Sequence, residues 1–67
     1  MKQQILQALR QHAEGQIAKH KANVDVYLNS TTGIGEHSDI LETLEKELNH
    51  IGKYKEQLDV LKTYFEN

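Results

Sequence analysis

The chain of 67 residues contains no cysteine, no proline and no tryptophan. Without cysteine it can form no disulfide and no thiolate-bound zinc, haem or iron–sulfur site. No segment approaches the roughly 18 consecutive apolar residues of a membrane span, and the first residues lack the apolar core of a signal peptide. The sequence therefore predicts a soluble, cytoplasmic protein that does not enter a membrane.

The chain is also short, with a mass of 7.7 kDa and a formal net charge of −2. Below about 70–80 residues one hydrophobic core rarely stabilises a fold, so small domains rely on disulfides, a metal or oligomerisation. Cysteine is absent and no metal site is evident. We therefore expect one domain over residues 1–67 that associates with a second copy or another partner.

The abundance of Leu, Glu, Lys, Gln and Ala and the absence of proline favour helix. Apolar residues recur at steps of three and four in two segments, which is the spacing of amphipathic helices and coiled coils. We predict helices over about residues 2–28 and 38–66, joined by a loop over about residues 29–37. The expected apolar face of the first helix comprises Leu6, Leu9, Ala13, Ile17, His20, Val24, Tyr27 and Leu28. That of the second comprises Ile40, Leu41, Leu44, Leu48, Ile51, Tyr54, Leu58, Leu61 and Phe65.

The segment between the helices has the composition of a turn, with two glycines, Asn, Ser and two Thr. Ser38 is the predicted N-cap of the second helix, with Thr32 and His37 as alternatives. A Gly-x-Gly sequence before a helix can offer backbone amides to an anion, but the dinucleotide and P-loop patterns are not met. Two interpretations stay open, a simple turn and a recognition loop. The candidate recognition loop comprises Gly33, Ile34, Gly35, Glu36 and His37.

A short loop makes the two helices antiparallel neighbours. With the midpoint between Gly33 and Ile34, facing residues should have numbers that sum to about 67. Ala13 then meets the large Tyr54. The five facing pairs predicted from this register are all apolar, namely Leu6–Leu61, Leu9–Leu58, Ala13–Tyr54, Ile17–Ile51 and Val24–Leu44. The same register predicts ion pairs of Arg10 with Glu56, of Lys21 with Glu45 and Glu47, and of Lys2 with Glu66.

The predicted fold class is therefore all-α, an antiparallel two-helix hairpin that dimerises into a four-helix bundle. Small residues on the first helix opposite its apolar face, together with off-face apolar residues near the end of the second, are the candidate oligomer interface. An exposed stripe of good helix formers and a frayed C-terminal end are the alternatives. The candidate interface residues are Ala8, Gly15, Ala18, Ala22, Val26, Val60 and Tyr64.

Candidate chemistry is sparse. Glu47 and His50 have the Glu-x-x-His spacing of di-iron bundles, but the first helix offers only Glu14 as a further glutamate. His20, on the apolar face, is expected to be a hydrogen-bonded group that fixes the register, with a pH switch and a ligand as alternatives. Such a hairpin should have no room for a cleft of about 300 Å³, and the hydroxyl residues lack a base. We expect no enzyme activity, no catalytic residue, no metal and no cofactor.

Residues 29–40, above all 33–40, together with residues 58–61 and Tyr64-Phe65, resemble small uncharacterised proteins of large tailed phages of marine cyanobacteria. The resemblance covers about the C-terminal two-thirds of the chain. It implies a hairpin shape, a viral origin and the host-cell cytoplasm as location. It implies no activity and transfers no site residue.

The expected function is a protein-interaction or assembly module that binds itself and, beyond that, a host or virion protein. The alternative is a dimeric RNA-binding hairpin that uses the basic face of the first helix. Residues 1–30 carry four basic and two acidic side chains, whereas residues 31–67 carry four basic and eight acidic ones. Because the net charge is negative and no basic run occurs, nucleic acid is the less favoured partner.

Overall fold

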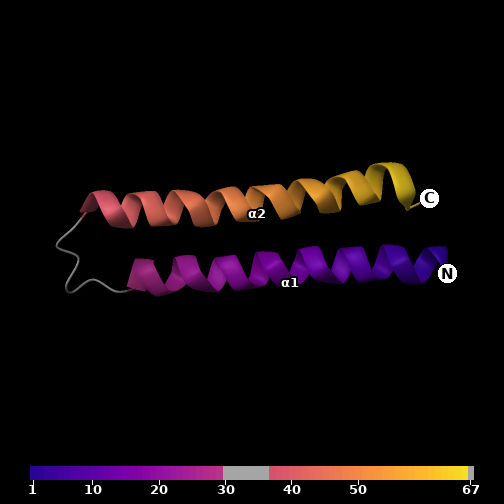
Figure 1. Cartoon of the computed structure of the whole chain (residues 1–67), viewed down its shortest axis with the longest axis horizontal. Helices are drawn as coiled ribbons and strands as arrows, with labels where there is room; N and C mark the ends of the chain where they lie inside the picture. Colours follow the sequence, from indigo (N-terminus) through magenta and orange to yellow (C-terminus); the bar gives the residue numbers. More distant parts are fainter. Residues whose placement is uncertain (30–36, 67) are drawn as a thin grey trace.

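The computed structural model describes residues 1–29 and 37–66, and within these ranges all regular structure is helical. Helix α1 (Lys2–Asn29) and helix α2 (His37–Phe65) lie side by side and antiparallel, with both chain ends at the same end of the molecule (Figure 1). Each helix bound lies within one residue of the predicted one. The prediction of an all-α hairpin is confirmed.

The ends of the helices follow local hydrogen bonding and charge. The Ile5 amide donates to the Met1 carbonyl at 3.1 Å, and the Asn29 side chain donates to the Asp25 carbonyl at 2.8 Å. Asp39 in the first turn of α2 and Lys62 in its last turn complement the helix dipole. The prediction of Ser38 as N-cap is wrong, because α2 already begins at His37; Thr32, one alternative, lies outside the described residues.

The helices meet along a seam with alternating steps of four and three residues, the coiled-coil repeat. Its buried or half-buried members on α1 are Leu6, Arg10, Ala13, Ile17, His20 and Val24. Those on α2 are Ile40, Leu44, Glu47, Ile51, Tyr54, Leu58 and Leu61. Six residues expected on the buried faces are instead exposed, because two helices cover only one narrow stripe of each other. These six are Leu9, Tyr27, Leu28, Leu41, Leu48 and Phe65.

The predicted register holds through the middle of the seam. His20 bonds to Glu47, whose numbers sum to 67, and the rings of His12 and Tyr54 meet edge to face at 5.7 Å. The predicted Arg10–Glu56 pair is wrong, because Arg10 occupies a seam position and its guanidinium reaches Glu66 at the chain end, at 3.0 Å. The pairs expected for Lys2 and Lys21 are not among the ion pairs of the described residues.

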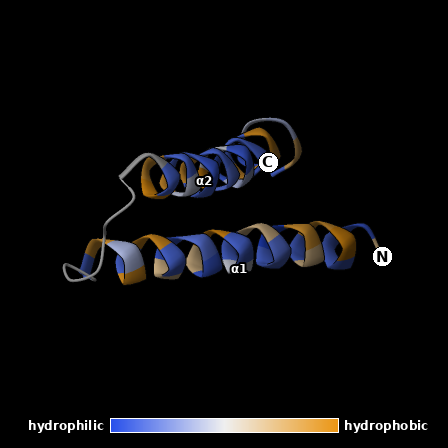
Figure 2. Ribbon diagram, turned by 60° about the vertical axis from the view of Figure 1, so that its left-hand side comes forward, coloured by the Kyte–Doolittle hydropathy of each residue, from blue (hydrophilic) through white to orange (hydrophobic). Residues whose placement is uncertain are grey.

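The hairpin is a thin rod of 50 × 15 × 13 Å with a radius of gyration of 15.5 Å. A compact domain of this length would have a radius of gyration of about 11 Å. Hydrophobic and hydrophilic residues alternate along both helices (Figure 2), yet among residues 1–29 and 39–66 only Leu6, Ala13 and His20 are buried. One hairpin therefore leaves most of its large apolar side chains in water.

Candidate functional site

A cluster of polar side chains occupies the seam where α1 and α2 pack midway along the rod. The His20 Nδ1 lies 2.5 Å from the Glu47 Oε2, and Asn23 Nδ2 donates to the Glu47 Oε1 at 3.1 Å. The His50 ring stacks on the His20 ring, with centroids 4.3 Å apart and planes 10° from parallel. Both carboxylate oxygens of Glu47 therefore have a partner on the opposite helix. The prediction that His20 is a hydrogen-bonded group is confirmed.

The surroundings of Glu47 favour its ionised form. The hydrogen bond with His20 is the largest cause and lowers the pKa of Glu47 below its ordinary value of 4.5. Partial burial acts in the opposite direction, and the hydrogen bond from Asn23 and the charges of His20 and His50 add to the lowering. The seam thus holds a carboxylate that stays charged at neutral pH and has its partners on α1.

The Glu47–His50 spacing does bring a carboxylate and an imidazole together, but not in a metal-binding arrangement. The nitrogen lone pairs of an imidazole lie in its ring plane, so the two stacked rings do not point at a common ion. In residues 1–29 and 37–66, no group of three potential ligands is placed to hold a metal. The hydrogen bonds and the ring stacking of the cluster run between the two helices.

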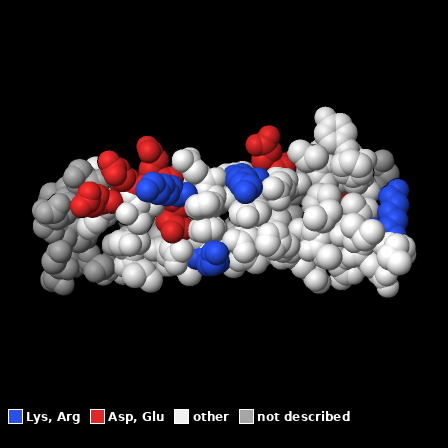
Figure 3. All heavy atoms as spheres, in the orientation of Figure 1, with Lys and Arg blue, Asp and Glu red and all other residues white. Residues whose placement is uncertain are grey.

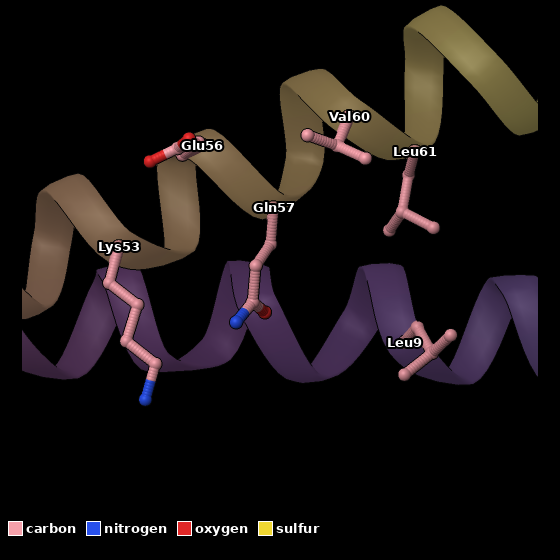
Figure 4. Close-up of a pocket in the computed structure, with 6 residues that line it drawn as sticks. All are labelled: Leu9, Lys53, Glu56, Gln57, Val60 and Leu61. Carbon is pink, nitrogen blue, oxygen red and sulfur yellow. The ribbon is translucent and has the colours of Figure 1, made fainter.

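A groove lies on one side of the seam, near the chain ends. It has a volume of about 590 Å³, is open to solvent and is lined by Leu9, Lys53, Glu56, Gln57, Val60 and Leu61. In Figure 4, Lys53 and Gln57 extend from α2 towards α1, and Leu61 points towards Leu9. The expectation that the hairpin has no room for a cleft of about 300 Å³ is wrong, because exposed flanking side chains shape a wide, open groove between the helices.

Further exposed apolar side chains extend this groove. Ile5 lies one turn before Leu9 on α1, and Tyr64 lies one turn after Val60 on α2, so each pair shares a helix face. In the view of Figure 3, acidic and basic side chains gather over the half of the rod near residues 29 and 37, and the half near the chain ends shows few of them. We call Ile5, Leu9, Val60 and Tyr64 the terminal apolar patch.

All seven predicted interface residues lie on the surface of the hairpin. Val60 and Tyr64 belong to the terminal apolar patch, whereas the five on α1 are spread along that helix. A Cβ atom added at Gly15 would meet nothing within 4 Å, so no contact within this chain requires a glycine there. Of the predicted recognition loop, Gly33, Ile34, Gly35 and Glu36 lie outside the described residues, and His37 is the first residue of α2.

Five of the six residues that line the groove were not predicted as site residues, namely Leu9, Lys53, Glu56, Gln57 and Leu61. Leu9 was placed in the core, whereas it lies at the edge of the seam and is half exposed. A signal was available on the second helix, because positions 53, 56, 60 and 64 follow one another at helical steps of three and four. That signal was obscured because two of these residues are charged.

The chain folds as an antiparallel two-helix hairpin. It has a hydrogen-bonded polar cluster in its seam and an open apolar groove beside it. Comparisons with protein families, with curated proteins and with solved structures find no match for the chain. Neither α1 nor α2 contains a stretch apolar enough to span a lipid bilayer.

Proposed function

We propose that this protein is a non-enzymatic interaction or assembly module that acts as a self-associating hairpin, two copies of which form a four-helix bundle. The observation that carries the proposal is the surface left in water. The hairpin exposes 5388 Å², whereas a compact monomer of the same mass exposes about 4,300 Å². The excess of about 1,000 Å² per chain matches what each partner buries in a stable protein–protein interface.

The charge distribution suits a second copy as that partner. Helix α1 carries four basic and two acidic residues, and α2 carries four basic and six acidic ones. Oppositely charged helices within one chain allow two identical chains to associate without net repulsion between the facing surfaces. A host or virion protein, the further partner that we propose, would use the same exposed surface in the cytoplasm.

The alternative of an RNA-binding hairpin receives less support. It needs the basic residues of α1 to be free for phosphate contacts. Arg10 is a seam residue that pairs with Glu66, and the remaining basic residues of α1 are Lys2, Lys19 and Lys21. Three dispersed lysines on a chain of net negative charge offer little positive charge for binding RNA phosphates.

Sedimentation equilibrium at about 1–100 µM protein tests the proposal, because it reports the mass of the assembly without a partner having to be known. We expect a mass of about twice 7.7 kDa. A stable, fully helical monomer across this range would overturn the proposal. In a parallel arm, fluorescence anisotropy with a single-stranded RNA at about 20 mM salt should show no binding; salt-dependent binding would favour the RNA alternative.

A further inference from the structure

The groove near the chain ends combines an apolar floor with one charge of each sign. Leu9, Val60 and Leu61 supply the apolar surface, and Lys53 and Glu56 supply the charges. Within the described part of the chain, neither Lys53 nor Glu56 has an ion-pair partner. The Lys53 Nζ lies 5.1 Å from the centroid of the neighbouring Tyr54 ring, towards α1. A surface with one unpaired charge of each sign can be complementary to a copy of itself.

The spacing of these charges selects one arrangement of two copies. Lys53 and Glu56 are three residues apart, which is about 4.5 Å along a helix. If two hairpins lie side by side in the same direction, Lys53 of each copy is within reach of Glu56 of the other, and the twofold axis makes this pair twice. The terminal apolar patch of each copy then meets that of the other copy.

An antiparallel arrangement of the two copies does not pair the charges and cover the terminal apolar patch at the same time. If the two copies of α2 ran antiparallel with Lys53 facing Glu56, the helical register would set Val60 opposite Asn49 and Tyr64 opposite Glu45. Exposed apolar side chains would then face polar ones. Only the parallel arrangement pairs the charges and covers the apolar residues together.

We propose that the groove lined by Leu9, Lys53, Glu56, Gln57, Val60 and Leu61 is the self-association site, and that a second copy binds there side by side and in the same direction. The inference rests on the proposed function and deepens it, because it replaces a general tendency to self-associate with one surface and one symmetry. A contact of this kind is isologous, so it closes at two copies. The small-residue stripe of α1 then lies outside the contact.

A charge-swap mixing experiment tests the pairing. Lys53→Glu and Glu56→Lys each place two like-charge contacts across the twofold axis, so each variant alone should dimerise at least about tenfold more weakly than the parent. When the two variants are mixed, both contacts become attractive again in the heterodimer. We expect mixing to restore association to within about threefold of the parent, as measured by sedimentation velocity.

A second pair of variants controls for the attraction between chains of different net charge. Lys62→Glu and Asp59→Lys make the same charge changes at exposed positions of α2 that are turned away from the groove. These variants should each dimerise like the parent, alone and mixed. If the groove variants also dimerise like the parent, the inference is overturned while the proposed function stands. If the parent itself is a monomer, both the inference and the proposed function are contradicted.

Cross-linking tests the direction of the two copies, and the absence of native cysteine makes single-cysteine variants unambiguous. Tyr64→Cys is expected to form an intermolecular disulfide, because the parallel arrangement brings the two copies of this position together. Leu41→Cys is the matched control, since Leu41 is 66% exposed and Tyr64 is 68% exposed. Equal cross-linking of the two variants, or cross-linking of Leu41→Cys alone, would overturn the parallel arrangement.

Discussion

The middle of the seam and the chain-end half of the rod differ in whether their side chains find partners within the hairpin. In the middle, Glu47 is held by His20 and Asn23 on the other helix, so the polar groups find their partners within the hairpin. Near the chain ends, the terminal apolar patch has no such cover and remains in water. The polar contact favours one register of the helices, whereas the apolar end supplies the surface for association. Four substitution experiments test this difference between the two regions.

The largest effect is expected at the few buried apolar positions. Leu6 is only 8% exposed, so Leu6→Ala should lower the free energy of unfolding by about 2–5 kcal/mol. A hairpin with so thin a core should then be largely unfolded at room temperature, as urea titration followed by circular dichroism would show. Leu28→Ala is the control; because Leu28 is 63% exposed, its effect should stay within about 0.5 kcal/mol. Similar losses for the two variants would contradict the described seam.

A smaller loss of stability is expected when one partner of the polar contact between His20 and Glu47 is removed. His20→Leu removes the main partner of Glu47 and should lower the melting temperature. The double variant His20→Leu/Glu47→Leu replaces both groups by apolar ones and should recover that loss. We also expect the double variant to show more than one set of amide signals in an ¹⁵N–¹H spectrum, because alternative registers are no longer penalised. A single set would show that the polar contact does not fix the register.

The polar contact should also make stability depend on acid. Because the folded-state pKa of Glu47 is below 4.5, ionised Glu47 stabilises the fold above that pH, and the contribution is lost as pH falls through the folded-state value. The groups that face Glu47 are His20 and Asn23 on α1 and His50 on α2. Between about pH 6 and pH 3, the melting temperature of the parent should fall more than that of Glu47→Gln. Parallel curves for the two proteins would contradict this account.

The smallest effect is expected on the small-residue stripe. Gly15→Ala should stabilise α1 by about 1 kcal/mol, since the added methyl group meets nothing within 4 Å. Gly52→Ala on α2 is the matched control and should act alike. Gly15→Leu should leave the dimerisation constant unchanged if the second copy binds the groove. Loss of the dimer in Gly15→Leu would instead indicate that the second copy contacts the small-residue stripe of α1.

Much of the fold follows from the sequence pattern. The spacing of apolar residues gave both helix bounds to within one residue, and the number of residues between the helices predicted the antiparallel register that His20 and Glu47 confirm. The N-cap at Ser38 and the pairing of Arg10 with Glu56 were wrong. A cap depends on backbone geometry over one or two residues, and a long side chain at a seam position can reach a partner several residues beyond its level.

The width of the buried stripe is the property that the tertiary structure determines and that sequence periodicity does not. Periodicity assigns a residue to a helix and to a general direction, so the sequence by itself determined two antiparallel helices and their register. It did not distinguish Leu9, at the edge of the seam, from Leu6 at its centre, because the two differ by a rotation that only the packed partner helix resolves. The tertiary structure therefore decided which apolar residues are covered, placed Glu47 and Arg10 in the seam, and left the groove beside Leu9 open.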